Sequence, residues 1–341
     1  MEHPKVSILC ITYGHENYIV ETLKGFLMQR YNGPIEIILS NDHSPDNTDQ
    51  VIKDFLDKAI IPANFEIKYT AHEQNLGMMP NFIWALQQCT GKYIAMCEGD
   101  DYWTDPLKLQ KQVDFLESNQ DYGLVITNLN FYYQENKTFL SGYLNQQSFE
   151  TNNNLETFLL NKAYMAPCTW LWRKKSIELD LKDLEKFADG TYVLFAHFLH
   201  QSKVHFIDQI TAVYRYLPES ASHSGSFEKL YEREKNLMVT DQYLLEKFNK
   251  QSFHNTLKNS YSERFLKIFD TDKEKRAAII NDLWLKQDEV LINFLHFVLD
   301  KYTLTQEENS ILKSKVSKIY KSKTFKIGSF ILSPIRKFIK Y

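Results

Sequence analysis

Three carboxylates lie within four residues, at Glu98, Asp100 and Asp101, and Gly99 separates the first two. Such clustering costs like-charge repulsion unless a cation neutralises it. Hard oxygen ligands suit Mg²⁺ or Mn²⁺, which commonly bind one or two protein carboxylates together with the phosphates of a substrate. The segment therefore predicts a site for a divalent cation and a diphosphate, and a solvated acidic turn is the alternative.

A second acidic turn begins at Asp42 and resembles a calcium loop only in part. Asp42, Ser44 and Asp46 fit the spacing of its first ligands, but Lys53 stands where a bidentate glutamate is needed. A strand-to-helix turn explains the segment better. In that interpretation Asp46 or Thr48 caps the helix that follows, while Asp42 faces a crevice or is itself a structural cap.

Both turns follow short apolar runs that alternate with helical patterns. The β-rich runs cover residues 6–12, 35–40, 65–69 and 93–97, and the helical patterns cover 18–29, 48–56 and 80–88. Strand, helix and strand at this spacing predict βαβ units and a mainly parallel α/β sheet. Gly91 is the predicted C-terminal cap of the third helix. Because ligands of open α/β sheets bind beyond the carboxyl ends of the strands, we expect the two acidic turns to share a crevice.

The remainder of the chain changes character twice. Mixed strand and helix patterns continue to residue 216, and a Pro/Ser/Gly-containing loop then precedes helical periodicity that runs to about residue 302. The last 31 residues hold nine Lys and Arg, no acid, and interleaved apolar positions. We expect three parts: a domain over 1–225, a helical subdomain over 226–310, and a basic amphipathic tail over 311–341. The tail suits docking on an anionic membrane surface, and a solvated or oligomer-forming tail is the alternative.

Composition limits the class and compartment. The chain has 341 residues and a formal charge of −3, which gives the whole molecule no general attraction to nucleic acid. Its four cysteines form no C-x-x-C pair and are expected to be buried thiols in a reducing cytoplasm. The N-terminal apolar run is too short for a secretion signal, and later runs are too short to span a bilayer. We therefore expect a cytoplasmic protein, peripheral to the membrane if the tail docks.

Five motifs in order resemble the inverting nucleotide-sugar glycosyltransferases of family 2, which have the GT-A fold. They are VSILCITY at 6–13, NDHSPD at 41–46, NLG at 75–77, GKYIA at 91–95 and EGDDYW at 98–103. The first hundred or so residues thus carry the resemblance, and residues 111–216 match more loosely. This chain departs from the family in having Asn41 and Glu98 where the first Asp of each acidic motif is usual.

The resemblance implies a role for each matching residue on the donor side. Tyr13 would pack on the nucleotide base, and Asp42 would accept the imide N–H of that base. Asp100 matches the metal-binding carboxylate, which implies Mn²⁺ or Mg²⁺ as cofactor, and Asp101 would be its partner or an alternate ligand. The residues expected to bind the nucleotide sugar are Thr12, Tyr13, Asp42, Asn75, Glu98 and Asp101, with Glu98 near the ribose.

Asp189 is the candidate catalytic base, because it precedes a helical run and resembles the acidic residue at the start of the family's acceptor-side helix. An Asp before a helix is also an ordinary N-cap, and Asp183 and Glu185 compete for the catalytic role.

Further residues resemble acceptor-side or late metal-binding positions of the family. Trp170, Trp172 and Arg173 match a strand beside the acceptor, where Trp would pack on a sugar and Arg would meet phosphate. Core packing is the alternative for both indoles. His223 would reach the metal or diphosphate from the loop, or would be solvated.

The resemblance implies an enzyme that moves a sugar from a nucleotide donor, expected to be a UDP-sugar, to a hydroxyl of a glycan or lipid-linked acceptor. Surface-polysaccharide synthesis is the expected process, and homo-oligomerisation stays open. Two alternatives are a catalytically silent sugar-binding or assembly subunit and a nucleotidyltransferase. The latter normally needs an early glycine-rich phosphate loop, and residues 12–15 contain one glycine.

Overall fold

The computed structural model describes residues 3–163, 165–217 and 226–271, together with Ser310, Ser314 and Ser317. Apart from these serines, the basic tail lies outside the described residues, so its membrane docking stays a prediction. None of the helices in the described part of the chain has the length and apolar composition that crossing a bilayer requires.

The described chain forms two compact units. One contains the described residues up to 217 together with Thr240–Lys250, and the other contains residues 226–239 and the described residues from Gln251 onward. The expected domain boundary at residue 225 stays a prediction, although this division places Thr240–Lys250 of the expected helical subdomain in the first unit. In the second unit, Arg264 Nη1 pairs with Glu234 Oε1 at 3.3 Å, and the rings of Tyr231 and Phe265 pack edge to face.

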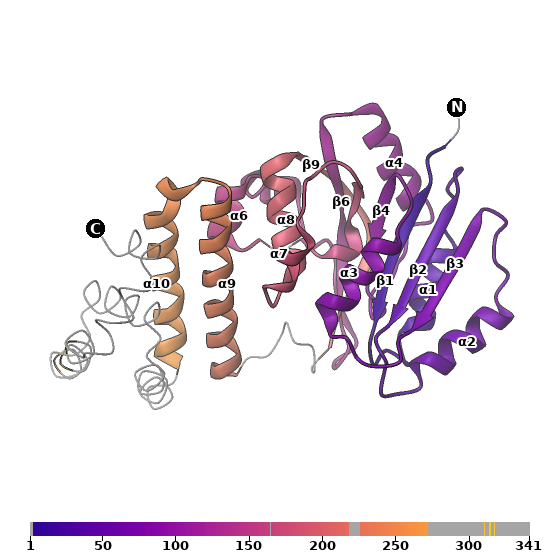
Figure 1. The fold of residues 1–341 in the computed structure, drawn as a ribbon, viewed down its shortest axis with the longest axis horizontal. Coiled ribbons are helices and arrows are strands. Elements are labelled where there is room, and N and C mark those ends of the chain that lie inside the picture. Colours follow the sequence, from indigo (N-terminus) through magenta and orange to yellow (C-terminus); the bar gives the residue numbers. More distant parts are fainter. Residues whose placement is uncertain are drawn as a thin grey trace. The chain divides into compact units, whose positions relative to one another are not determined.

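The first unit is built on one mixed sheet in the order β3-β2-β1-β4-β8-β6-β9-β5, with β7 paired to β6 (Figure 1). The parallel strands β1 to β4 confirm the predicted βαβ units. β1, β2 and β4 are buried along their whole length, as in a parallel sheet covered on both faces, whereas the edge strand β3 alternates exposed and half-buried residues. The strands are β1 Val6–Thr12, β2 Ile35–Asn41, β3 Phe65–Ala71, β4 Tyr93–Met96, β5 Tyr102–Trp103, β6 Tyr122–Tyr133, β7 Thr138–Leu140, β8 Leu171–Arg173 and β9 Lys203–Tyr216.

Helices cover both faces of this sheet. Alternate residues of β1, such as Val6, Ile8 and Cys10, share one core with apolar residues of α1, α2 and α4. The order in which strands are added reverses between β3 and β4, so the right-handed crossover through α3, which contacts β1 and β2, lies on the other face. The helices are α1 Ile19–Leu27, α2 Thr48–Lys58, α3 Met78–Gln88, α4 Lys108–Ser118, α5 Gln146–Thr151, α6 Leu155–Asn161, α7 Leu181–Glu185, α8 Gly190–Gln201, α9 Phe227–Lys247 and α10 His254–Thr271, with 3-10 turns at Pro167–Thr169 and Gln251–Phe253.

Gly91 does not cap α3, which is a correction to the sequence interpretation. The helix ends at Cys89 in an extended conformation. A Cβ on Gly91 would lie 2.7 Å from the backbone nitrogen of Ser7. Glycine is therefore required here for the close approach of two backbones rather than for a helix end.

Glu36 binds the amino ends of the parallel strands together, at the end of the sheet opposite the acidic turns. Its buried carboxylate accepts hydrogen bonds from Ser7 Oγ of β1 and from the N–H groups of Thr90 and Gly91. Lys5 and Lys68 pair with it at 2.8 and 3.0 Å. Burial alone would raise the pKa of Glu36, but these hydrogen bonds outweigh burial and hold that pKa well below its usual range.

The first prediction concerns this carboxylate. Glu36→Gln should lower the free energy of unfolding at pH 7 by about 3 kcal/mol, because it removes the charge that two lysines and several N–H groups share. The folded-state pKa of Glu36 is lower than the unfolded one, so its contribution is present at neutral pH and is lost as pH falls below the unfolded value. Urea unfolding at pH 7 and at pH 3 should therefore show a smaller gap between the two proteins at pH 3.

The matched control is Glu66→Gln, since Glu66 is exposed and meets the same two lysines at 3.5 and 3.6 Å. It should change stability by less than about 0.5 kcal/mol. An equal loss in both variants would contradict the role given to Glu36.

Candidate active site

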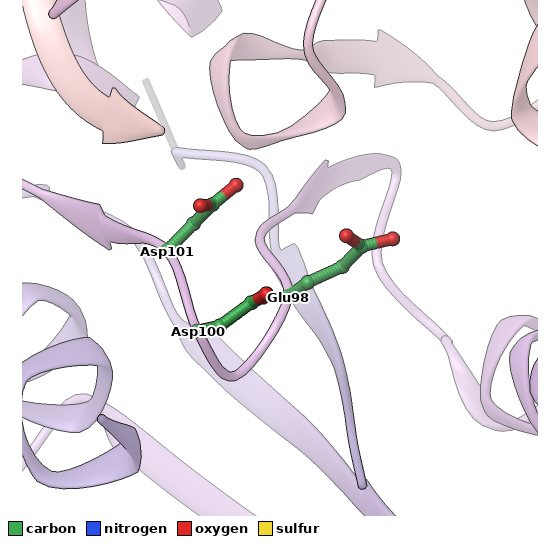
Figure 2. A group of neighbouring side chains, drawn as sticks. All are labelled: Glu98, Asp100 and Asp101. Carbon is green, nitrogen blue, oxygen red and sulfur yellow. The ribbon is translucent and has the colours of Figure 1, made fainter. Parts of the chain in front are cut away.

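The acidic turn, Glu98 to Asp101, follows β4 at the carboxyl edge of the sheet. One oxygen from each of Glu98, Asp100 and Asp101 lies within 4.8 Å of one from the other two. Figure 2 shows the three side chains projecting from this single turn. Asp101 is buried, and Glu98 and Asp100 are half-buried. The sequence prediction that these oxygens form one group is therefore correct in geometry.

Side chains of α1 and β9 donate hydrogen bonds to the backbone carbonyls of the acidic turn. Thr22 of α1 donates its hydroxyl to the carbonyls of Gly99 and Asp101, at 3.0 and 2.6 Å. Arg215 Nε donates to the carbonyl of Asp100 at 2.8 Å. A Cβ on Gly99 would lie 2.5 Å from Thr12 Oγ1, so only glycine permits this packing. Three successive carbonyls are thus satisfied on the side away from the carboxylate group.

The carboxylates of the acidic turn have raised pKa values. Burial, with a smaller contribution from the charges of Asp100 and Asp189, raises the pKa of Glu98 to about 8. Burial, Asp100 and Glu98 likewise raise the pKa of Asp101 well above its usual range. Carboxylates that repel one another in a partly dry setting fit a divalent cation, and the all-oxygen set matches the chemistry of Mg²⁺ or Mn²⁺.

Asp189 lies at the N-terminus of α8 and within electrostatic range of Glu98. Its Oδ1 accepts hydrogen bonds from the N–H of Tyr192 and the hydroxyl of Thr191, at 2.9 and 2.7 Å. It is therefore the N-cap that the alternative described, and its side chain is exposed. The two interpretations are compatible because a carboxylate has two oxygens.

Asp183 is engaged elsewhere, although it was a competitor for the catalytic role. Burial would raise the pKa of Asp183, but hydrogen bonds from Lys247, Tyr243 and Lys186 lower it to about 2. These contacts bind α7 to the second half of α9 within the first unit. Asp183 is thus part of an ion-pair network, and Glu185 is exposed at the end of α7.

Asp42 joins the second acidic turn to α3. Its two carboxylate oxygens accept the N–H groups of Leu76 and Gly77, at 2.7 and 2.9 Å. Asn41 Oδ1 closes the second acidic turn by accepting the N–H and the hydroxyl of Ser44, three residues further on. Because position 41 is asparagine rather than the usual aspartate, its Nδ2 can also donate a hydrogen bond to the hydroxyl of Tyr69 on β3.

The predicted donor-side residues surround the end of β1. Thr12 is buried beneath Gly99, and the ring of Tyr13 is 48% exposed beyond the strand. Gly14 has a φ of +72°, a conformation that side chains rarely adopt, and its N–H donates to Ser44 Oγ. Asn75 is exposed just before α3.

The structure favours core packing over acceptor contact for Trp170 and Trp172, both of which are buried. Trp170 stacks on Phe195 of α8, with ring centroids 5.4 Å apart. Arg173 donates to the hydroxyl of Tyr93 and to a backbone carbonyl of α4, which occupies its guanidinium inside the fold. The burial of both indoles agrees with the core-packing alternative, and the contact of the half-buried Arg173 with an acceptor phosphate stays a prediction.

His223 lies outside the described residues, so its predicted metal contact stays a prediction. His197 and His200 of α8 pack against Phe248. The four cysteines are free and buried, as expected.

Two residues near the acidic turn were missed by the sequence analysis. His15 Nε2 lies 3.9 Å from Asp100 Oδ2, and its Nδ1 lies 3.1 Å from Thr12 Oγ1. Arg215 reaches the turn from β9, more than a hundred positions away in the sequence. His15 could have been found from its position just after β1, at the edge of the sheet where ligands bind. Nothing in the local sequence identifies Arg215.

Comparisons with known proteins agree with this geometry. An uncharacterised protein of Mycobacterium tuberculosis, Rv1520, is 42% identical over 116 residues, which cover 34% of this chain and 32% of that protein. The Escherichia coli UDP-Glc:alpha-D-GlcNAc-diphosphoundecaprenol beta-1,3-glucosyltransferase WfaP is 32% identical over 138 residues, or 40% of this chain and 49% of WfaP. The chain thus spans about a third of the first of these curated relatives and half of the second.

Two solved structures share the fold. Residues 1–349 of TarS from S. aureus, in complex with UDP-GlcNAc, have a TM-score of 0.52 at 17% identity, covering 93% of this chain and 89% of that TarS segment. The mannosyltransferase PcManGT of Pyrobaculum calidifontis, in complex with GDP-Man and Mn²⁺, has a TM-score of 0.52 at 13% identity, covering 97% of this chain and 84% of PcManGT. The fold is therefore the expected GT-A architecture.

The family model "Glycosyl transferase family 2" matches residues 7–179. That stretch begins in β1, includes both acidic turns, and ends just before α7. With the acidic turn at the carboxyl edge of a GT-A sheet, the chain belongs to glycosyl transferase family 2.

Proposed function

We propose that the chain is a metal-dependent inverting glycosyltransferase, which moves a sugar from a nucleotide donor to an acceptor hydroxyl. One observation carries the proposal: an oxygen from each of Glu98, Asp100 and Asp101 lies within 4.8 Å of the other two at the carboxyl edge of the sheet, and the charge of Asp189 contributes to the raised pKa of Glu98. A cation-type ligand set and a candidate base therefore occur together. Family membership supports the same reaction class.

A UDP-sugar is the donor we favour. TarS is described in complex with UDP and with UDP-GlcNAc, and the name of WfaP includes UDP-Glc. The GDP-Man complex of PcManGT makes a GDP-sugar the competing donor. On this chain, the exposed ring of Tyr13 would pack on the base. Asp42 would accept an imide N–H in addition to its two backbone N–H groups, since a carboxylate has about four acceptor positions.

Asp100, with Glu98 and Asp101 beside it, would hold Mn²⁺ or Mg²⁺. When bound, such an ion neutralises negative charge on the departing diphosphate. The backbone of the turn is already fixed by Thr22 and Arg215, so little reorganisation is needed when charge develops.

Asp189 would be the general base. Both hydrogen bonds that the described residues make to its side chain go to Oδ1, which leaves Oδ2 to accept the proton of the acceptor hydroxyl. The acceptor oxygen then bonds to the anomeric carbon as the bond to the diphosphate oxygen breaks, so the configuration inverts. The cap hydrogen bonds fix the orientation of the carboxylate for this attack.

The proposed acceptor is a glycan or a lipid-linked sugar in surface-polysaccharide synthesis. The printed name of WfaP gives an undecaprenol-linked acceptor for that relative. The basic segment 311–341 would then keep the enzyme near an anionic membrane surface. A catalytically silent sugar-binding subunit is the competing proposal; metal-dependent hydrolysis of a nucleotide sugar by the wild type would favour the enzyme, and binding without turnover would favour the silent subunit.

Thermal unfolding with UDP, GDP, TDP and CMP, each with and without Mn²⁺, tests the donor and metal proposals together. We expect UDP to raise the melting temperature only when Mn²⁺ is present. A ligand at 100 times its Kd adds about 2.7 kcal/mol to the folded state. A shift by GDP alone would replace the donor, and no shift by any nucleotide would contradict the proposed donor site.

Asp100→Asn should abolish this metal-dependent shift and lower the rate of sugar transfer on the order of 10²-fold or more, because it removes a charged ligand. The matched control is Asp114→Asn, a surface position of α4 that accepts a hydrogen bond from Gln110. It should behave as the wild type. Equal activity in the Asp100 variant would remove that residue from the mechanism.

Asp189→Asn tests the base separately from the fold. Asparagine caps helices as well as aspartate does, so stability should hold while kcat falls by about 10²- to 10⁴-fold. Asp183→Asn should do the reverse: it should lose roughly 2–3 kcal/mol of stability from its ion-pair network and keep its kcat. If kcat responds to Asp183 and not to Asp189, the assignment of the base is wrong.

A further inference from the structure

Arg215, near the end of β9, contacts the acidic turn in two ways. Its backbone N–H donates to Asp101 Oδ1 at 2.8 Å, and its side-chain Nε donates to the carbonyl of Asp100, also at 2.8 Å. The residue is only 6% exposed. One residue of a distant strand thus fixes both a carboxylate and a carbonyl of the turn.

The guanidinium of Arg215 is enclosed by three tyrosine rings. Its central carbon lies 4.8 Å from the ring centre of Tyr18, 5.1 Å from that of Tyr102 and 5.6 Å from that of Tyr132. Favourable contact with these ring faces holds the cation in place. Its ion-pair partner among the described residues is Glu21, whose carboxylate is half exposed and lies 2.7 Å from Nη2.

The charge of Arg215 is therefore directed away from the carboxylates of the acidic turn. Among the described ion pairs, Asp100 meets only His15, at 3.9 Å, and Arg215 meets only Glu21. The arginine supports the backbone of the turn while the negative charge of its carboxylates stays available to a cation. Lysine cannot reproduce this arrangement, because a single ammonium lacks the planar fork that reaches two acceptors at once.

We propose that the Arg215 side chain positions the cation site: its Nε holds the Asp100 carbonyl, and its enclosure fixes the end of β9 whose N–H binds the Asp101 carboxylate, so that the three carboxylates converge before a cation binds. The inference rests on the proposed function, which assigns the acidic turn to a divalent cation. Mutation of a residue that hydrogen-bonds to a metal ligand typically lowers metal affinity by 10- to 100-fold.

Mn²⁺ titration of the full chain, followed by the electron paramagnetic resonance signal of free Mn²⁺, tests this proposal without an activity assay. Arg215→Lys should weaken Mn²⁺ binding roughly 10-fold or more. Glu21→Gln, which removes the exposed ion-pair partner and leaves both contacts to the turn, should bind Mn²⁺ as the wild type does. Melting temperatures recorded in parallel show whether each variant is folded at the assay temperature. If Arg215 only stabilised the fold, the folded variant would bind Mn²⁺ with wild-type affinity.

Tyr132→Leu provides a milder variant if Arg215→Lys does not fold. It removes one ring from the enclosure of the guanidinium and should weaken Mn²⁺ binding by a smaller factor, with Tyr133→Leu as its neighbour on the opposite face of β6. If the folded Arg215→Lys variant binds Mn²⁺ with wild-type affinity, the positioning role is overturned. If Arg215→Lys does not fold, the same result for Tyr132→Leu overturns it. Absence of Mn²⁺ binding by the wild type would instead overturn the metal assignment of the proposed function, and this inference with it.

Discussion

Repulsion between three carboxylates in a partly dry turn is the constraint on which the rest of the site depends. Burial raises the pKa of both Glu98 and Asp101, so each resists ionisation next to its neighbours. The fold opposes this cost with hydrogen bonds to the backbone of the turn rather than with positive charge at the carboxylates, since Thr22 and Arg215 bind its carbonyls. The main chain of the turn is thus fixed by hydrogen bonds, while the negative charges of its carboxylates are left to repel one another.

Distant parts of the chain meet at this turn because the sheet is locked at both ends. Glu36 joins β1, β2 and the start of β4 at the amino edge. At the carboxyl edge, Gly190 packs directly on Met79, where an added Cβ would lie 2.1 Å from a methyl group. The starts of α3 and α8 are therefore in contact, which brings the helix that Asp42 anchors next to the helix that Asp189 caps.

The sequence predicts what depends on local periodicity and on turn composition, and these predictions include the βαβ order and the acidic turn. It does not predict Arg215, because that contact requires the antiparallel pairing of β5 with β9 across more than a hundred residues. Nor does composition separate an indole in the core from one on a sugar-binding surface, as Trp170 illustrates. Gly91 misled for a similar reason, since its neighbour is a strand far away in the chain.

The hydrogen bonds of Asp42 have a consequence for how phosphate can be bound. Many α/β proteins place phosphate at the positive end of a helix dipole, where unpaired N–H groups point toward the ligand. Here the N–H groups of Leu76 and Gly77, just before α3, already bind Asp42, and Pro80 in the first turn has no N–H. A carboxylate of the protein, rather than a phosphate, thus takes these two N–H groups at the start of α3, so a diphosphate at the acidic turn, as we propose, would not have them as donors.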